Sequence, residues 1–485
     1  MEIGCGRRDL GVLAVSCFLL RLPALVWDRF YDPDEAAIAV QARTIIAGGR
    51  LYVDMADRKP PIPPFIYAGW FALTDSNDLR GPRLIASALL AVAAVVLALD
   101  VARTHGRRAA LWTGALFVLG SFALSPGDGG AANYAHFALP LATLALVACR
   151  RGGWWTMVAG LLLGLAILSR QSWVFAIPAA AVSCWMAARL RGVVLFAAGV
   201  VAGVASAALY VPWSDYWFWN FSSSPGFVFA SIGLGTVFGR GLGALAFFVL
   251  LHIALVAGAA SILRSSWRTR GDLWLWTITG LAAISAGFRF YGHYWLQIVA
   301  PLAVLSGTAV ANWSPRWRAL CGATLAMSAV FSVVALCVPT VFRERRNAAP
   351  LAAVIRRCTA PSDRIFIWGS FPELYVLADR PAAGGLVHTD FVTGRSGGRT
   401  TGTDAATPGA QQRLLADLEA APPALLVETS GVRDLGYGAL PMLTYPAFAE
   451  FTRGGYSAQA TPDGFTLWWR SPSQFLCASS WSVER

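Results

Sequence analysis

The chain has 485 residues, of which 56% are hydrophobic and only 14% are charged. Soluble globular domains carry about 25% charged residues, so this composition excludes an ordinary water-soluble protein and indicates a membrane protein. The net charge of +12 raises nucleic-acid binding as an alternative, and the positions of the arginines and of the single lysine, Lys59, decide between the two.

Eleven apolar segments approach the roughly 20 residues that a helix needs to cross the hydrocarbon core of a membrane. The first, residues 10–27, follows two arginines, but Arg21 interrupts it and no small-residue cleavage site follows. We therefore interpret it as a retained span and not as a signal peptide. The stretch "LSRQS" separates the two weakest segments, which are typical of a broken helix pair. The other ten segments are residues 81–101, 108–125, 131–149, 154–169, 172–190, 192–212, 240–263, 272–288, 294–311 and 318–338.

The connections between these segments predict the orientation of the chain. With the N-terminus inside, the six cytoplasmic segments contain 14 arginines and almost no acid. This alternation follows the positive-inside rule, explains most of the net charge and removes the reason to expect nucleic acid. An odd number of spans then places the residues after about 339 outside the cytoplasm. We expect a multi-pass protein of the cytoplasmic (inner) membrane.

The last part of the chain, residues 340–485, has a soluble composition with 14 basic and 13 acidic residues. "RIFIWG", "ALLVET" and "FTLWWR" read as strands, and "QQRLLADLEA" reads as a helix. We expect a small extracytoplasmic α/β domain that follows a transmembrane module, residues 1–339. A disulfide between Cys358 and Cys477 is open as an alternative to free thiols, because outside the cytoplasm the compartment permits it.

The first outer loop, residues 28–80, is long, acidic and contains Lys59. In "YDPDEAAIAVQARTIIAGGR" the acids at Asp32, Asp34 and Glu35 precede a helical apolar pattern that ends at two glycines. One interpretation is that Asp32 caps this helix and the other acids complement its dipole. The other is that a carboxylate at the mouth of the bundle serves as a general base. Lys59 stands before two prolines, where it either binds a lipid phosphate or lies at the interface.

Two other outer connections also carry polar groups. The second outer loop, "SPGDGGAANYAHFALP", contains Asp128, Asn133 and His136, of which Asp128 alone reads as a turn residue. The connection "FRFYGHYWLQIVAPL" contains Arg289, His293 and Tyr294 at the outer end of a span. Arginine and tyrosine are common interfacial anchors, but so many polar groups entering one apolar helix end are costly without a polar ligand. Carboxylates and cations that converge on one side of a membrane suit transfer from a phosphorylated lipid to a hydroxyl.

The order and spacing of several segments resemble the GT-C fold glycosyltransferases that use polyprenyl-phosphate sugars. These segments are "DPDEAAIAVQARTIIAGGRLYVDMADRKPPIPPFIYA", "LRGPRLIASALL", "GHYWLQIVAPLAVLSG" and "DRIFIWGSFPELYVLADRPAA". The likeness is to the bacterial branch that includes the aminoarabinose transferase of lipid A and the protein O-mannosyltransferases. It implies a GT-C-like bundle and an inverting transfer of one sugar. It covers residues 10–310 strongly and the tail more weakly.

The resemblance also implies site residues. The family's catalytic aspartate falls on Asp34, with Glu35 as the acid that follows it, and the family's phosphate-holding lysine falls on Lys59. Arg289 and His293, with Tyr294 beside them, fall where the donor phosphate is expected. Many relatives have a second acid where this chain has Ala135, so Asp128 or His136 supplies the polar group or one carboxylate suffices. We predict no cofactor. A divalent metal ion, which some relatives bind, stays open but unsupported, because the chain offers too few paired carboxylates to predict one.

The predicted function is transfer of a hexose or pentose from a polyprenyl-phosphate donor to a lipid, a cell-wall glycan or a protein, with no nucleic acid involved. Two alternatives belong to other classes. A transporter or flippase for lipid-linked sugars would show internal repeats, and none is visible. A non-catalytic glycan-binding scaffold would need one span and not eleven, although loss of the second acid is compatible with it. The sequence names neither the sugar nor the acceptor.

Overall fold

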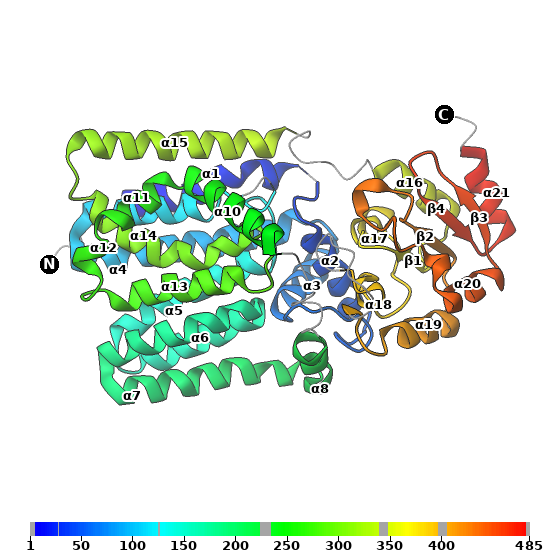
Figure 1. Ribbon diagram of the computed structural model, residues 1–485, viewed down its shortest axis with the longest axis horizontal. Helices are drawn as coiled ribbons and strands as arrows, with labels where there is room; N and C mark the ends of the chain where they lie inside the picture. The colour runs from blue at the N-terminus through cyan, green and yellow to red at the C-terminus, as the bar shows by residue number, and fades with distance from the viewer. Residues whose placement is uncertain are drawn as a thin grey trace.

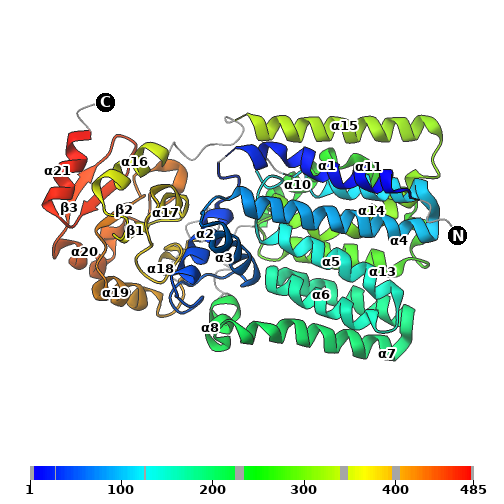
Figure 2. The same ribbon diagram turned by 180° about the vertical axis from the view of Figure 1, so that it is seen from behind.

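The computed structural model describes residues 5–27, 29–124, 127–223, 234–338, 348–395 and 405–481. A bundle of long apolar helices occupies one end of the molecule, and a smaller unit of strands and helices occupies the other (Figure 1). We call the described residues 348–481 the C-terminal unit. Residues 29–79, which follow the first long helix of the bundle and precede the second, pack between the bundle and this unit, as the view from behind also shows (Figure 2).

The bundle forms because its helices are apolar on most sides and bury their small residues against one another. Two buried polar side chains inside it bond across helices: Arg21 donates to the carbonyl of Ser121 at 2.9 Å, and Ser183 donates to Asp272 at 2.9 Å. The helices of the bundle are α1 (Arg7–Val26), α4 (Arg80–Gly120), α5 (Tyr134–Arg151), α6 (Trp155–Ser169), α7 (Ile177–Ala205), α10 (Leu234–Leu251), α11 (Ile253–Ser261), α12 (Leu263–Ser266), α13 (Gly271–Ser285), α14 (Leu296–Val310) and α15 (Pro315–Cys337).

Five helical stretches in the described residues are long and apolar enough to cross a membrane: α1, α4, residues 171–209, α10 and α15. With 41 residues, α4 would be about 60 Å long, twice the thickness of the hydrocarbon core. It is interrupted at Gly106, where φ is 79°, and α7 is interrupted at Ala188 and Arg189. Each of these helices therefore consists of two segments. The count of eleven spans stays a prediction.

Two predicted spans have internal breaks. The short 3₁₀ helix η1 (Gln171–Ala176) separates α6 from α7, which is the break that the "LSRQS" stretch indicates. Residues 240–263, predicted as one span, form α10 and α11, because His252 has a non-helical backbone conformation. The chain leaves the helical path at these points, and at the first of them a polar residue, Arg170, ends α6.

Glycines allow α6 and the second segment of α7 to approach closely. A Cβ on Gly160 would lie 2.0 Å from the carbonyl oxygen of Phe196, and one on Gly199 would lie 2.1 Å from the carbonyl oxygen of Met157. Both helices carry a second glycine four residues further on, Gly164 and Gly203. This spacing is the small-residue pattern by which membrane helices bring their backbones together.

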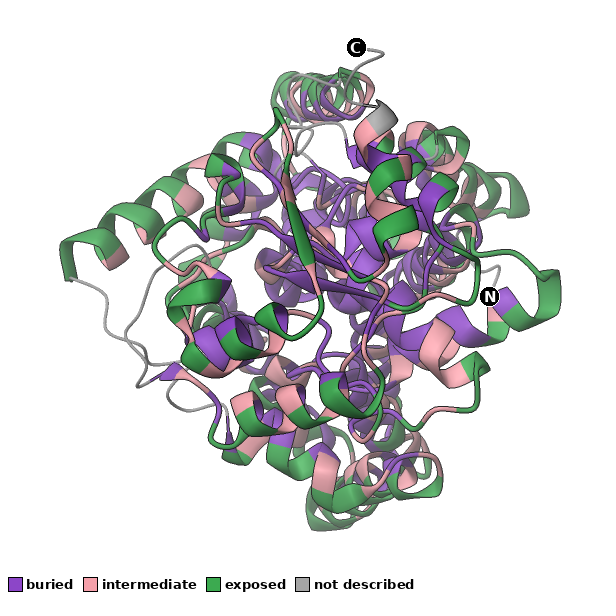
Figure 3. Ribbon diagram, turned by 90° about the vertical axis from the view of Figure 1, so that its right-hand side faces the viewer, coloured by how far each residue is buried: buried purple, intermediate pink, exposed green. Residues whose placement is uncertain are grey.

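The C-terminal unit is built on a four-stranded sheet in the order β1-β2-β4-β3. The strands β1 and β2 run parallel to each other and are fully buried, and the other two pairs of neighbouring strands are antiparallel. Helices surround the sheet, so buried residues gather at its centre and exposed ones on its outer helices (Figure 3). The strands are β1 (Ile365–Trp368), β2 (Leu425–Glu428), β3 (Ser457–Ala460) and β4 (Thr466–Trp469). The helices are α16 (Ala348–Cys358), α17 (Glu373–Ala378), α18 (Asp390–Thr393), α19 (Ala410–Ala420), α20 (Pro446–Arg453) and α21 (Pro472–Trp481).

The strands β1, β2 and β4 and the helix α19 lie where the sequence predicts them. β3 is exposed and polar, which is why alternation did not reveal it. A disulfide joins Cys358 to Cys477 and so ties the start of the unit to its last helix. The division of the chain into domains at residues 339 and 340 lies outside the described residues and stays a prediction.

The segment between α1 and α4, predicted as an outer loop, contains two helices, α2 (Pro33–Ile46) and α3 (Ile62–Thr74). A third short helix, α8 (Trp213–Trp217), lies on the same side (Figure 1). The helix α2 begins where the sequence predicts, because Asp32 caps it, and ends before two glycines. These helices place the polar residues of the first loop between the bundle and the C-terminal unit.

Candidate active site

The first turn of α2 brings a carboxylate against the only lysine of the chain. The N-cap Asp32 accepts the backbone N–H of Asp34 at 2.9 Å, and Pro33 fits the first helical position. This geometry directs Asp34 toward Lys59, whose Nζ donates to Asp34 Oδ2 at 3.0 Å. The ammonium also lies 5.0 Å from the centre of the Tyr134 ring. Two residues 25 positions apart therefore form one half-buried ion pair.

Both members of this pair keep their charge at neutral pH. Burial alone would raise the pKa of Asp34, but Lys59 and His293 hold it below its usual value. Burial opposes the charge on Lys59 as well, yet Asp34 and Tyr294 raise the pKa of the lysine above its usual value. The pair is thus a stable positive and negative charge at the end of the bundle that faces the C-terminal unit.

A second cation, Arg170, lies beside Lys59. Its guanidinium stacks on the ring of Tyr294 at 4.2 Å, and its Nε donates to Ser172 at 3.1 Å. Arg170 ends α6 and is largely buried, and its charge acts on the pKa values of both Asp34 and Lys59. Sequence reasoning did not select Arg170. Its position at the break in "LSRQS" was the available signal, because a helix break in a span exposes polar groups where a ligand can reach them.

Four side chains from three segments of the chain meet next to Asp34: Asp32, Asp128, Asn133 and His293. His293 Nδ1 lies 2.6 Å from Asp128 Oδ1 and 3.6 Å from Asp32 Oδ2. Asn133 Nδ2 donates to Asp32 at 2.8 Å. Burial, Asp34 and Asp128 together raise the pKa of Asp32 to about 7, although His293 lowers it. Asp32, which the sequence left as a helix cap, therefore also has the pKa of a group that exchanges protons near neutrality.

One member of this cluster, Asp128, comes from the second loop. The structure brings its carboxylate to the first loop through the contact with His293, and its role stays a prediction. Ligand atoms of Asp32, Asp128 and His293 all lie within 4.8 Å of one another, and carboxylate and imidazole groups are ligands for a divalent metal ion. The expectation of too few paired carboxylates did not foresee this group, because its members are far apart in the sequence.

The two other second-loop candidates extend from the same cluster into the bundle. Asn133 caps α5 through its side-chain oxygen, which accepts the N–H of Ala135 at 3.0 Å. The same oxygen lies 3.0 Å from Nδ1 of His136, which is buried in α5. Asn133 is thus a link between Asp32 and His136. The imidazole of His136 is therefore connected to the carboxylate of Asp32 through the side chain of Asn133.

Glu35 has a different environment from Asp34. Its carboxylate is fully buried and accepts Nε and Nη2 of Arg83 at 2.8 and 3.0 Å and the backbone N–H of Ala132 at 2.9 Å. Arg83 in turn donates to the backbone carbonyls of Ala24 and Trp27. These contacts tie α1, α2, α4 and the second loop together. The structure therefore places Glu35 in a structural ion pair and Asp34 in the open part of the site.

Arg289 lies between two residues with left-handed backbone conformations, Phe288 (φ 55°) and Phe290 (φ 52°). Such backbone strain is found where a structure must present a particular side chain. Arg289 lies close enough to Arg58 to affect its charge. The pKa of Arg58 is lowered to about 10, mainly by burial and in part by the positive charge of Arg289. Arg58 is therefore a second basic residue of the first loop at this site. Sequence reasoning selected its neighbour Lys59 and passed over Arg58.

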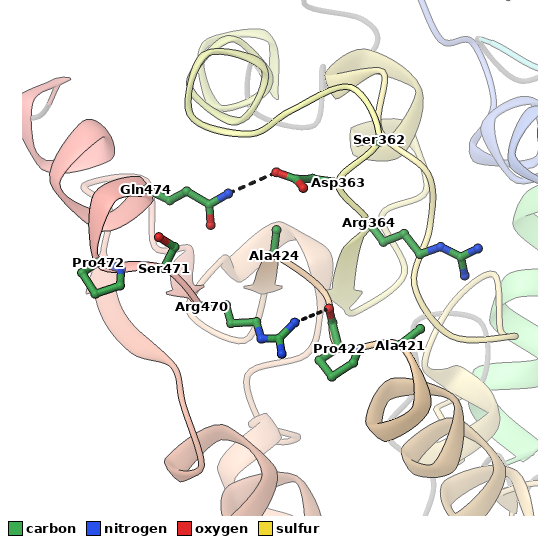
Figure 4. Close-up of a pocket in the computed structure, with 10 residues that line it drawn as sticks. All are labelled: Ser362, Asp363, Arg364, Ala421, Pro422, Ala424, Arg470, Ser471, Pro472 and Gln474. Carbon is green, nitrogen blue, oxygen red and sulfur yellow. Dashed lines mark hydrogen bonds between the residues drawn. The ribbon is translucent and has the colours of Figure 1, made fainter.

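A separate hollow of about 740 Å³ lies on the C-terminal unit, among residues 362–364, 421–424 and 470–474. Its polar side chains bond to its own walls: Gln474 donates to Asp363 at 3.1 Å, and Arg470 donates to the carbonyl of Pro422 at 3.3 Å (Figure 4). It is formed by the connections before β1 and β2 and after β4. None of the sequence-predicted site residues lines it.

No protein-family profile matches the sequence, and no curated protein matches it. Solved structures do match. ArnT from Cupriavidus metallidurans, crystallised with undecaprenyl phosphate, is 15% identical, with a TM-score of 0.63 over 97% of this chain and 99% of that one. The oligosaccharyltransferase AglB from Archaeoglobus fulgidus, in complex with an inhibitory peptide and dolichol phosphate, is 13% identical, with a TM-score of 0.52 over 96% of this chain and 74% of that one.

At this level of identity the likeness concerns the fold. The match extends over nearly the whole length of both this chain and ArnT. The chain therefore has the GT-C fold that the sequence resemblance implies. Fold alone does not establish activity, which must be argued from the site.

Proposed function

We propose that this protein is a membrane glycosyltransferase that moves one sugar from a polyprenyl-phosphate donor to an acceptor hydroxyl at the outer face of the membrane. The observation that carries the proposal is the Asp34–Lys59 pair at 3.0 Å, with Arg170 beside it, at the outer mouth of an apolar bundle. A lipid phosphate needs cations at this depth, and the reaction needs a carboxylate beside them. The solved proteins of similar fold were crystallised with undecaprenyl and dolichol phosphates, which supports this class of donor.

In the proposed reaction the acceptor oxygen attacks the anomeric carbon as the bond from that carbon to the phosphate oxygen breaks. The leaving polyprenyl phosphate keeps the bonding electrons, and the new glycosidic bond forms on the opposite face, so the configuration is inverted. Asp34 takes the proton of the acceptor hydroxyl. Lys59, Arg170 and Arg289 balance the charge that develops on the phosphate, with Tyr294 and His293 at the same side of the site.

The ion pair gives donor binding a role in activating the base. Without a donor, Lys59 holds the pKa of Asp34 low, which makes Asp34 a weak base. A phosphate that draws Lys59 toward itself removes part of this effect, and burial then raises the basicity of Asp34. The base is thus strengthened only when the donor is in place.

The topology that goes with this function is also proposed. We infer eleven spans, a cytoplasmic N-terminus, a transmembrane module over residues 1–339 and an extracytoplasmic domain over residues 340–485. The arginines in alternate connections support this orientation, and the Cys358–Cys477 disulfide supports an oxidising compartment for the C-terminal unit. The site would then face outward, in or at the cytoplasmic membrane of the cell.

The test is transfer by the purified protein in detergent. A panel of synthetic polyprenyl-phosphate hexoses and pentoses is offered with octyl hexosides, octyl pentosides and a serine- and threonine-containing peptide, and products are identified by mass spectrometry. We expect one donor to support transfer and Asp34→Asn to abolish it, while Asp54→Asn, an acid of the same loop outside the site, remains active. Absence of transfer from every donor, together with no binding of undecaprenyl phosphate, would show that the proposed function is wrong.

A further inference from the structure

The C-terminal unit is joined to the first loop by backbone pairing directly before Lys59. The N–H of Ala56 donates to the carbonyl of Gly385 at 2.7 Å, and the N–H of Val387 donates to the carbonyl of Ala56 at 3.3 Å. Arg58 adds a side-chain bond, from Nη2 to Thr407 Oγ1 at 2.8 Å. The segment that carries Lys59 is therefore fixed to the C-terminal unit, and a residue of this unit next to the pairing lies at the edge of the site.

That residue is His388, whose ring lies between two carboxylates. Its Nδ1 is 3.9 Å from Asp390 Oδ2, and its Nε2 is 4.0 Å from Asp57 Oδ1. The ring stacks on Phe391 with an angle of 10° between the planes, which fixes its orientation. Both nitrogen–oxygen distances exceed the 2.7–3.2 Å of a direct hydrogen bond. The imidazole is thus held in place without being bonded to either carboxylate.

The two carboxylates differ in what holds them. Asp390 is fixed from within the C-terminal unit, because it accepts the hydroxyl of Tyr437 and Nη1 of Arg395 at 3.4 Å. Asp390 lies on the Nδ1 side of the His388 ring, and Nδ1 has no hydrogen-bond partner among the described residues. The other ring nitrogen, Nε2, faces Asp57 and the first loop.

Asp57 is held in place from the first loop and the bundle by three hydrogen bonds that it accepts. Gln41 Nε2 and the hydroxyl of Tyr134 donate to Asp57 Oδ2 at 3.0 and 3.3 Å, and the N–H of Arg58 donates to Oδ1 at 2.7 Å. Gln41 is fully buried, and its side-chain oxygen has no hydrogen-bond partner among the described residues. An unpaired acceptor in a buried place is costly, so the oxygen of Gln41, whose amide nitrogen bonds Asp57, favours a ligand that brings a hydrogen-bond donor.

We propose that Asp57 and His388 form an acceptor-binding site, in which a hydroxyl of the acceptor sugar or side chain donates its hydrogen bond into the gap between His388 Nε2 and Asp57. The proposal deepens the proposed function and rests on it. It makes the C-terminal unit a contributor to the active site, since His388 touches the substrate from the side opposite the bundle. The Tyr134 side chain connects the two halves, because its hydroxyl contacts Asp57 and its ring lies under the Lys59 ammonium.

The charge state of His388 agrees with this role. Burial above all lowers the pKa of His388, and Arg58 and Lys59 lower it as well, against the opposing effect of Asp390 and Asp57. The ring is therefore neutral at pH 7 and accepts a hydrogen bond, whereas a charged imidazolium would close onto the carboxylates. A hydroxyl donor suits this site better than an anionic group, because both carboxylates would repel an anion.

The experiment compares His388→Ala and His388→Gln with the wild type, using the octyl glycoside or peptide to which the wild type transfers. We expect His388→Ala to raise the KM for that acceptor by roughly 10-fold or more, the loss typical of an unpaired buried polar contact. His388→Gln, whose amide reaches toward the position of Nε2, should recover most of this affinity. The KM for the donor and the binding of undecaprenyl phosphate should stay within about 2-fold of wild type, since neither depends on an acceptor contact.

The matched control is His105→Ala, which removes an imidazole at the other end of the bundle, where it contacts Arg270 and Thr104. An unchanged acceptor KM in His388→Ala, with active wild-type protein, would overturn this inference and leave the proposed function standing. Equal changes in the donor and acceptor KM would assign His388 a purely structural role and would also overturn it. A wild-type protein that neither transfers nor binds undecaprenyl phosphate overturns the proposed function and this inference with it.

Discussion

Asp34 and Lys59 form an ion pair of 3.0 Å across 25 residues of sequence, and the pair joins the start of α2 to the turn before α3. The two prolines after Lys59 restrict the backbone there, so the ammonium is presented from a stiff turn. The same lysine is the counter-ion of the proposed base and the proposed holder of the phosphate. Donor binding and base activation are thereby coupled through one side chain.

This coupling predicts a pH effect of Lys59→Met. Removing the ammonium removes the main interaction that lowers the pKa of Asp34, so the acidic limb of the kcat/KM profile should move to higher pH. The rate should also fall by roughly 100-fold or more, because a charge that stabilises the leaving phosphate is lost. Lys59→Arg keeps the charge and should leave the limb near its wild-type position. An unshifted limb in Lys59→Met would mean that Asp34 is not the group that titrates.

The raised pKa of Asp32 predicts a pH dependence of stability. Its pKa rises from the usual 3.8 to about 7 in the folded protein, so the folded state binds the proton more tightly than the unfolded state. The contribution of Asp32 to stability is then fully present below about pH 4 and is lost as pH rises from about 4 to about 7. Between about pH 5 and pH 8 this loss is roughly 2–3 kcal/mol. Asp32→Asn, which can still cap α2, should show a smaller fall in Tm over this range than the wild type.

The control for this measurement is Asp54→Asn, in the same loop, where the carboxylate is half-exposed and bonds the N–H of Arg50 at 2.6 Å. Its pH dependence should match that of the wild type. If Asp32→Asn and the wild type lose the same Tm between the two pH values, another group is responsible for the loss. Because the cluster of Asp32, Asp128 and His293 can also bind a cation, both proteins should be compared in the same buffer with a chelator.

Glu35 and Asp34 are adjacent in the sequence, but we predict opposite phenotypes for them. Glu35→Gln leaves Arg83 without its buried counter-ion, which should cost roughly 3–5 kcal/mol of stability and lower the yield of folded protein. The folded fraction should transfer sugar within about 3-fold of the wild-type rate, whereas Asp34→Asn should fold normally and be inactive. Activity per folded molecule, from a thermal melt and an initial rate on the same sample, separates the two. A stable, inactive Glu35→Gln protein would restore the catalytic assignment of Glu35.

The bundle was largely predictable from the sequence because span length, apolar composition and arginine position are local properties. The first turn of α2 was also predictable, since Asp32, Pro33 and the following acids are a local signal for a helix start. The α6–α7 contact could have been found in the same way, because the glycine spacing of each helix is visible in the sequence. Breaks such as the one at His252 were missed, because the apolar pattern continues through them.

The site was predictable only in part, because its members meet through tertiary structure. Resemblance selected Asp34, Lys59 and His293, which the structure does bring together. It did not reveal that Asp128 contacts His293 across 165 residues, or that Asp32 has a second role besides capping. No local pattern marks His388, since its neighbours Asp57 and Asp390 come from two different parts of the chain.

The disulfide predicts the compartment of the C-terminal unit. Cys358 and Cys477 are 119 residues apart, and a loop of this length gives a stabilisation of about 4–5 kcal/mol in the chain-entropy account. If the unit lies outside the cytoplasm, both thiols should be oxidised in cells, so a maleimide reagent that labels denatured protein should react with them only after reduction. Cys358→Ser with Cys477→Ser should lower the Tm of the unit and increase its proteolysis without changing the expression of the bundle. Cys17→Ser, in the first helix, is the control variant that leaves the disulfide intact. Labelling of both Cys358 and Cys477 before reduction would contradict the proposed orientation.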